Sequence, residues 1–353
     1  MNEARITTKT GYLIGLAAAI LFGLSAPVSK ALLDHVGPQM LAGLLYLGAF
    51  LAIGPAARLR PGRRREAPLR RADVPRVAVV VVTGGVIAPV LLMLGLQRTS
   101  GIAGSLALNM EGPLTLLVGV LIFREYLGRR SWLGSILIFG GAALLGIEGS
   151  NGGLDLLGLA FILLACGGWA IDNNVTQTLT TRDPFAIVTV KTSVAAVVNI
   201  GLALLISGGV VPVAFAAVGA LALGAVAYGV SVLLDAYALR LLGAARESAI
   251  FATAPFAGAL LAVPLLGDHW GVTDLVAAVG MAVGVVTLVG DHHSHRHTHE
   301  PLDHEHQHVH DAHHQHEHPA DTDPREPHSH PHHHDRLVHA HPHVSDAHHR
   351  HKH

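Results

Sequence analysis

Charged residues and cysteines are scarce in this chain of 353 residues. Only 14% of the residues are Asp, Glu, Lys or Arg, whereas 50% are hydrophobic and the mean hydropathy is +0.45. This composition excludes a soluble domain of this length and predicts a chain that lies in a lipid bilayer. The single cysteine, Cys166, excludes an intrachain disulfide and any metal site built from several cysteines.

Signals of ATP hydrolysis and of enzymatic catalysis are also missing from the sequence. No phosphate-binding loop of the form Gly-x-x-x-x-Gly-Lys-Ser/Thr occurs. No nucleophile stands beside a general base in a recognisable setting. We therefore expect neither an ATP-driven protein nor an enzyme, and no cofactor is required.

Long apolar stretches fill the chain up to residue 290. A helix needs about 20 apolar residues to cross the hydrocarbon layer. On that measure the predicted fold class is an all-α integral membrane protein with ten transmembrane helices. The predicted spans are 11–33, 38–57, 77–96, 103–123, 132–148, 156–178, 185–206, 213–238, 247–266 and 271–290.

Arginine gathers in alternate connections between these spans, and the opposite connections hold essentially Arg98 alone. The positive-inside rule assigns arginine-rich connections to the cytoplasm. Both termini are therefore predicted to be cytoplasmic in a multi-pass protein of the cell membrane. The arginines of these connections are Arg58, Arg60, Arg63, Arg64, Arg65, Arg70, Arg71, Arg76, Arg124, Arg129, Arg130, Arg182, Arg240 and Arg246.

The membrane part of the chain also matches itself. Residues 105–145 align without a gap on residues 248–288, and the alignment brings Glu125 onto Asp268 and glycines onto glycines at two further places. Five predicted spans separate the two copies, and an odd number inverts the second copy relative to the first. Inverted repeats are a recurrent plan of secondary transporters, whose substrate site lies near mid-membrane between the halves.

These features resemble the drug/metabolite transporter superfamily, EamA type. The resemblance rests on ten spans in two inverted halves, on the Glu125-Tyr-Leu-Gly and Asp268-His-Trp-Gly turns and on Ala252-Thr-Ala-Pro-Phe256. It implies a carrier of small organic solutes such as amino acids, metabolites or toxic compounds, often an exporter. Two departures are Asp268, where Glu is usual, and Glu111-Gly-Pro in place of a Glu-Pro pair.

The predicted organisation follows from the spans and this resemblance. Residues 1–10 form a cytoplasmic N-terminus, residues 11–148 the first five-helix EamA-like repeat and residues 149–290 the second. Residues 291–353 form a cytoplasmic histidine-rich tail.

Glu111 is the first candidate for a functional group inside the membrane. It lies near the middle of the fourth predicted span beside Asn109, and Gly112 and Pro113 follow it. Ionisable groups within spans are costly and usually face the bundle interior, a partner or a water-filled path. A Gly-Pro pair loosens a helix and frees backbone carbonyls for a substrate. Glu111 and Asn109 are therefore candidate substrate-binding residues, with proton coupling through Glu111; the alternative is a structural kink with Glu111 bonded to a neighbouring helix.

Asp172, Asn173 and Asn174 form the densest polar cluster at membrane depth. Asp172 in the sixth span and Lys191 in the seventh lie at similar depth in a helical hairpin, so an ion pair between them is geometrically feasible. These four residues are candidate substrate-binding residues that line the path. The alternatives are a purely structural pair or a Lys191 side chain that snorkels to the interface.

Two further ionisable residues complete the candidate substrate site. Lys30, near the outer end of the first span, either meets an anionic substrate group or snorkels to the interface. Asp235 either lines the path or pairs with an arginine near the end of the eighth span. Asp268 is expected to cap the turn before the last helix. Gly280 and Gly284 form a small-xxx-small face that suits close packing within the chain or in a homodimer.

The tail holds 25 of the 27 histidines, and its acidic residues outnumber its basic ones by 11 to 5. A His-x-His pattern places alternate imidazoles on one face of an extended chain. Imidazole suits Ni, Co, Zn and Cu, so the tail is predicted to bind a divalent transition metal. Because its few apolar residues cannot form a core, the tail is predicted to be disordered. The candidate metal ligands are His295, His297, His299, His304, His306, His308, His310, His313, His314, His316, His318, His339, His341 and His343.

The sequence leaves two functions open. The first is a secondary carrier that moves a small organic solute by alternating access, with a metal-binding tail that tunes or supplies it. The alternative is a transporter of a divalent transition metal ion that the tail feeds or buffers. The spans contain no histidine, which favours the first function. The expected partners are membrane lipid, a small-molecule solute, transition metal ions and, as a candidate, a second copy of the chain, with no nucleic acid.

Overall fold

The computed structural model describes residues 2–59, 67–123, 127–146, 156–179, 182–242, 244–290, 293–299, 302–308, 328–334 and 337–343. The helices in chain order are α1 (Asn2–Gly23), α2 (Ser25–Leu32), α3 (Pro38–Leu59), η2 (Arg71–Asp73), α4 (Val74–Val80), η3 (Val81–Ile87), α5 (Ala88–Arg98), α6 (Gly101–Ala107), η4 (Leu108–Met110), α7 (Glu111–Phe123), α8 (Arg129–Leu145), α9 (Leu156–Gln177), α10 (Pro184–Ile206), α11 (Ala214–Leu223), η5 (Gly224–Val230), α12 (Ser231–Leu242), α13 (Ala244–Phe251), α14 (Ala254–Leu266) and α15 (Val272–Val289).

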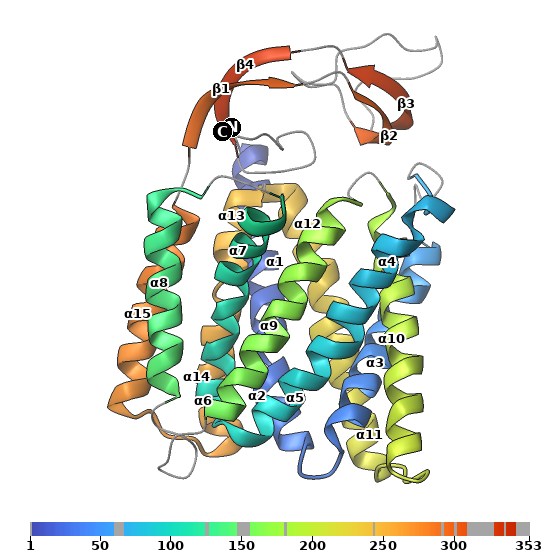
Figure 1. Cartoon of the computed structure of the whole chain (residues 1–353), viewed down its shortest axis with the longest axis vertical. Helices are drawn as coiled ribbons and strands as arrows, with labels where there is room; N and C mark the ends of the chain where they lie inside the picture. The colour runs from blue at the N-terminus through green and yellow to red at the C-terminus, as the bar shows by residue number, and fades with distance from the viewer. Residues whose placement is uncertain are drawn as a thin grey trace.

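The helices run up and down in one bundle (Figure 1). We call the end at which α1 begins and α15 ends the tail end, because the tail strands lie beyond it, and we call the opposite end the distal end (Figure 1). Large apolar side chains such as Leu121, Val197 and Leu205 are exposed on the bundle. Their exposure is the pattern of a surface that lipid covers rather than water.

The predicted all-α membrane architecture is confirmed. Within the described ranges, nine helical segments are long and apolar enough to cross a membrane, and they overlap nine of the ten predicted spans. The remaining predicted span corresponds to α8, which has 17 residues and packs along α15. With α8, the bundle contains the ten predicted spans.

Helix interruptions recur at matching places in the two halves. The third span contains the π-helical turn η3 and the eighth contains η5. The fourth span breaks at η4, and the ninth breaks between α13 and α14 at Ala252 and Thr253. Both pairs follow, within about one residue, the offset that aligns residues 105–145 with 248–288. Such breaks release backbone polar groups that need a partner or a cavity at membrane depth.

Backbone contacts through glycine join the halves just beyond mid-bundle on the distal side. A Cβ atom on Gly23 would lie 2.6 Å from the carbonyl oxygen of Ala254. A Cβ atom on Gly258 would lie 2.7 Å from the carbonyl oxygen of Gly23. Only glycine permits so close an approach, so α1 and α14 touch through their main chains.

The small-residue face of the last helix serves packing within the chain at one of its two glycines. A Cβ atom on Gly284 would lie 2.8 Å from the carbonyl oxygen of Gly134, which brings α15 against α8. Gly280 faces open space instead. The Gly284 contact is therefore already used inside the chain.

The sequence predicts a tail without regular structure, but the structure describes four short strands in it. β1 (His293–His299) pairs antiparallel with β4 (Leu337–His343), and β2 (Leu302–His308) pairs antiparallel with β3 (His328–His334). The prediction considered only the missing apolar core, whereas the His-x-His alternation has the two-residue period of a strand. Each sheet has two strands that pair through their main chains, and isolated two-stranded pairs are only marginally stable in water.

Candidate functional site

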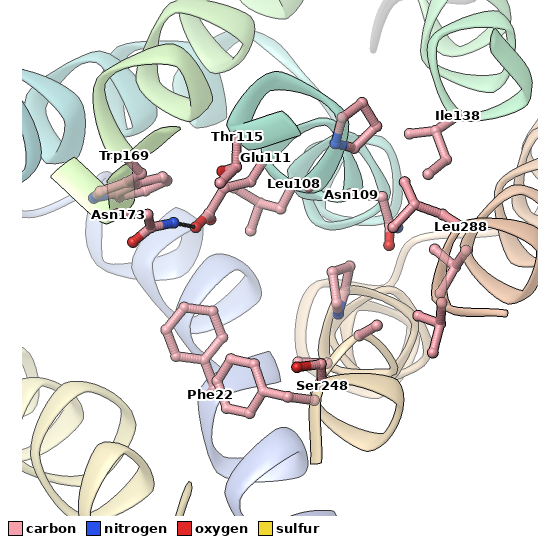
Figure 2. A pocket seen from close by; sticks show the side chains of 18 of the residues that line it. Phe22, Leu108, Asn109, Glu111, Thr115, Ile138, Trp169, Asn173, Ser248 and Leu288 are labelled. Atoms are coloured by element: carbon pink, nitrogen blue, oxygen red, sulfur yellow. Dashed lines mark hydrogen bonds between the residues drawn. The ribbon is translucent and has the colours of Figure 1, made fainter. Parts of the chain in front are cut away.

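A cavity of about 440 Å³ lies inside the bundle and is lined by helices of both halves (Figure 2). Most of its wall is apolar. Its polar and ionisable residues are Ser25, Asn109, Glu111, Thr115, Trp169, Asn173, Tyr228, Asp235, Glu247 and Ser248. A largely apolar cavity of this size with a few polar groups is typical of a small-molecule site.

The helix breaks place polar residues in the cavity wall. Asn109 lies in η4, and Glu111 begins α7 directly after it. Asn173 Nδ2 on α9 donates a hydrogen bond of 2.8 Å to Glu111 Oε1 (Figure 2). Two predicted substrate-site residues, Glu111 and Asn173, therefore meet at one side of the cavity, whereas Asn109 lies elsewhere in its wall, near Leu288 (Figure 2). The sequence predicts that Glu111 lines the substrate path or, as the alternative, is bonded to a neighbouring helix. Glu111 does both, because it lines the cavity and accepts a hydrogen bond from α9.

A second acidic group lies in the cavity wall on α12 and α13. Asp235, a predicted site residue, lines the cavity together with Glu247. Glu247 is 7% exposed, and sequence reasoning missed it because it stands at the start of the ninth span, where charged residues usually flank the membrane. The available signal was its position four residues before Phe251, which puts both on one helix face.

The predicted ion pair between Asp172 and Lys191 is confirmed, and neither residue belongs to the cavity lining. Lys191 Nζ donates to Asp172 Oδ2, and Thr176 Oγ1 donates to Asp172 Oδ1 at 3.1 Å. The side chains of Asp172 and Lys191 are 4% and 20% exposed. A Cβ atom on Gly84 would overlap the Asp172 carboxylate, so the glycine at this position of η3 makes room for the pair.

Side chains around this pair satisfy carbonyl groups of η3. Tyr46 Oη and Trp169 Nε1 donate to the carbonyl oxygen of Gly84 at 2.6 and 3.1 Å. Asn199 Nδ2 donates to the carbonyl oxygen of Gly85 at 3.1 Å. A π-helical turn departs from the ordinary helical hydrogen-bond ladder, and these donors compensate for it. Trp169 thereby links the cavity wall to the helices around the ion pair.

Two further predicted substrate-site residues, Asn174 and Lys30, also lie outside the cavity lining. Asn174 Nδ2 donates to the carbonyl oxygens of Thr115 and Ala170, both at 2.9 Å, and so ties α9 to α7. Lys30 Nζ donates at 3.0 Å to the carbonyl oxygen of Leu96, near the C-terminal end of α5. Both contacts are ones that stabilise helix packing.

Asp268 caps a different helix from the one predicted. Its Oδ2 accepts a hydrogen bond of 3.0 Å from the main-chain N–H of Ile102, in the first turn of α6. The first turn of α15 is instead held by Asp274, whose Oδ2 accepts from Gly271 N at 3.0 Å. The prediction used sequence adjacency, whereas the fold brings α6 of the first half beside the loop of Asp268. Asp268 thus joins the two halves at the distal end.

The candidate metal ligands of the tail fall into two groups. The strand register sets His295, His297 and other histidines of β1 opposite histidines of β4, and it does the same for β2 and β3. Among residues whose side chains are described, no group of three or more His, Cys, Asp or Glu is arranged to hold a metal ion. The candidate ligands outside the described residues are His310, His313, His314, His316 and His318.

A bundle of membrane-spanning helices around a central cavity lined by both halves is the architecture expected of a membrane transporter. The chain belongs to the EamA-like transporter family, whose model matches residues 9–147 and again residues 156–290. It is 29% identical over 293 residues to an uncharacterized transporter of Methanothermobacter thermautotrophicus, covering 79% of this chain and 85% of that protein. One solved crystal structure shares the fold with a TM-score of 0.57 at 18% identity, over 79% of this chain and 98% of the solved chain.

Proposed function

We propose that this transporter is a secondary carrier that moves a small organic solute by alternating access, and that the solute binds in the central cavity. The observation that carries the proposal is the cavity itself, with Glu111 and Asn173 on one side and Asp235 and Glu247 in its wall. A site shared by two halves changes its exposure when one half moves against the other.

The packing around the cavity supports alternating access. Toward the distal end, the main-chain contact of Gly23 with Ala254 and Gly258 joins α1 to α14. The bond from Ile102 to Asp268 adds a polar contact between the halves at that end. The cavity includes Leu288 and Val289 from the last turn of α15 and so extends to the tail end. This arrangement suits a carrier closed toward its distal end.

Proton coupling through Glu111 is part of the proposal. Its carboxyl group lies in the cavity wall, and it has one hydrogen-bond partner on another helix, Asn173. Proton gain or loss at this carboxyl changes its charge and its bond to the amide, which couples protonation to the contact between α7 and α9.

We also propose that the tail end faces the cytoplasm. The arginine-rich connections precede α4, α8 and α10 and follow α3, which is the tail end of those helices (Figure 1). Arg182 Nε contacts Asp73 Oδ2 at 2.8 Å, and Arg76 lies 3.9 Å from the same carboxylate, so part of this charge is held in place. Both termini are then cytoplasmic.

The tail is proposed to bind a divalent transition metal in the cytoplasm. The register of β1 with β4 supports this function, because directly opposed residues of an antiparallel pair have Cβ atoms about 4.5–5.5 Å apart. Because alternate residues of a strand share a face, we propose that the His-x-His pattern brings several imidazoles together. The tail is proposed to tune or supply the carrier rather than to form its substrate site.

Flux measurements in proteoliposomes test the carrier. The full chain, Glu111→Gln and a deletion of residues 291–353 are compared for proton-driven uptake or release of a panel of amino acids, amines and organic acids, and for flux of zinc, nickel and cobalt. We expect organic solute flux in the full chain, its loss of proton dependence in Glu111→Gln, and its persistence without the tail. Metal flux that survives the deletion but stops in Glu111→Gln would instead establish the metal ion as substrate.

A further inference from the structure

Among the described residues, the cavity wall carries acidic side chains and no basic ones. Glu111, Asp235 and Glu247 line it, and no Lys, Arg or His is among the described residues that do. The nearby cation Lys191 is held by Asp172 outside the lining. A mostly apolar wall strengthens the field of its few carboxyl groups.

Asp235 and Glu247 offer unused acceptor atoms. Their carboxyl groups lie close enough to share a proton, whose place a bound cation can take. Asp235 Oδ1 and Glu247 Oε1 are both buried, and neither has a hydrogen-bond partner within the described part of the protein. Buried polar atoms are almost always paired in folded proteins, so two orphan oxygens in a cavity wall indicate a donor that arrives with a ligand.

Aromatic rings line the same cavity as the two carboxyl groups. Phe251 follows Glu247 by four residues on α13, a spacing that shares a helix face, and Tyr228 lines the same cavity from η5. Phe22 packs against both rings, with centroids 5.7 Å from Tyr228 and 5.1 Å from Phe251. Aromatic faces attract cations, so these rings are an independent indication of a positively charged ligand.

The size and donor set of the site restrict the cation. The mostly apolar cavity of about 440 Å³ suits an organic body rather than a bare ion. The described part of the chain has no third His, Cys, Asp or Glu grouped with the two carboxyl groups in a metal-holding arrangement. Divalent metal ions usually require more ligands than that.

We propose that the cavity selects organic ammonium ions, with the ammonium group held between Asp235 and Glu247 and its apolar body against Phe22 and Phe251. This inference rests on the proposed solute carrier and names its substrate class. An ammonium group donates three hydrogen bonds and carries one positive charge, which matches two carboxyl groups with free acceptors.

Binding of three matched probes to the purified full chain tests the inference. Phenethylammonium, phenethyl alcohol and hydrocinnamate share a phenyl ring on a short chain and differ in charge. Isothermal titration calorimetry at neutral pH is expected to give the tightest binding for phenethylammonium. Asp235→Asn and Glu247→Gln should each weaken that binding by about tenfold to hundredfold, the range of a hydrogen bond to a charged group. Binding of the alcohol should change little.

Asp34→Asn is the matched control, because it removes an exposed carboxylate that does not line the cavity. It should leave phenethylammonium binding unchanged. Wild-type protein that binds the alcohol or hydrocinnamate as tightly as the cation, or that binds no cation, overturns the inference without reliance on any variant. Folded variants with wild-type cation affinity overturn it as well.

Flux in proteoliposomes separates this failure from a failure of the carrier. If neutral or anionic solutes cross and cations do not, the secondary carrier stands and the ammonium site falls. If no solute of any charge crosses, the proposed carrier function itself is wrong.

Discussion

Replacing Lys191 by Met removes the cation from the buried pair with Asp172 while it keeps most of the apolar length of the side chain. The Asp172 side chain is 4% exposed, and its remaining partner is the Thr176 hydroxyl at 3.1 Å. Gly84 lies against the carboxylate, so the backbone leaves little room for water to replace the ammonium group. The substitution therefore leaves a buried carboxylate without a positive charge or enough hydrogen-bond donors to offset its loss of hydration.

The cost of this change follows from the burial of both partners. Removing one partner of a buried ion pair destabilises a protein by about 3–5 kcal/mol, whereas removing both costs much less. We expect Lys191→Met near the lower part of that range, because the Lys191 side chain is still 20% exposed. The double variant Asp172→Asn with Lys191→Met should recover most of the loss.

Titration of the full chain with a denaturing detergent, followed by tryptophan fluorescence, measures the free energy of unfolding. Lys30→Met is the comparison variant, because Lys30 Nζ donates one bond of 3.0 Å to the Leu96 carbonyl oxygen, and the loss of this bond should cost about 1.5–3 kcal/mol, less than the loss at Lys191. A Lys191→Met protein as stable as the wild type would refute the reasoning. So would a double variant no more stable than Lys191→Met alone.

Two further outcomes follow from the structure. Gly84→Ala should lower the free energy of unfolding by about 1–3 kcal/mol, because the added methyl group overlaps the Asp172 carboxylate and overpacks the core there. Gly140→Ala is the control, because a Cβ atom there meets open space, and it should leave the free energy of unfolding unchanged or raise it by up to about 1 kcal/mol. Equal effects at the two sites would contradict this account. Zinc binding by residues 291–353 should weaken as pH falls from about 7.5 to 5.5, since imidazoles with pKa values near 6.5 lose their ligand lone pair on protonation. Calorimetry on the full chain measures this binding, with the tail deletion as control. Binding that is independent of pH would exclude imidazole as the main ligand.

The spans were predictable because the bilayer imposes a simple physical requirement. Every apolar stretch of about 20 residues must satisfy its backbone as a helix, and length with composition is enough to find it. The same reasoning placed Glu111 and Asp235 among the candidate site residues, since an ionisable residue at membrane depth usually faces the bundle interior or a water-filled cavity. Both line the cavity.

Residues near span ends were harder to interpret. Glu247 at the start of the ninth span and Lys30 near the end of the first have similar sequence settings, yet one lines the cavity and the other bonds to a backbone carbonyl group. Charged side chains at such positions reach either water or the interior, and the local sequence does not distinguish them. Asp268 shows the same limit, because its partner Ile102 is remote in the sequence.

The histidine tail illustrates how composition and pattern answer different questions. Its scarcity of apolar residues predicts that no core forms there, but it does not address main-chain pairing. The alternation of His295, His297 and His299 has the period of a strand, and β1 pairs with β4. Metal binding by these histidines stays a prediction that the calorimetry above decides.

The sequence by itself determined that this chain is a helical membrane protein built from two related halves. The lengths of its apolar stretches, the distribution of its arginines and the alignment of one half on the other can all be found in the linear sequence. Tertiary structure alone decided which polar residues share a cavity. Asn109, Glu111 and Asn173 meet there with Asp235 and Glu247, whereas Asp172 and Lys191 satisfy each other beside it. The physical reason is that a helix presents each side chain in one direction, and only packing against other helices determines what lies in that direction.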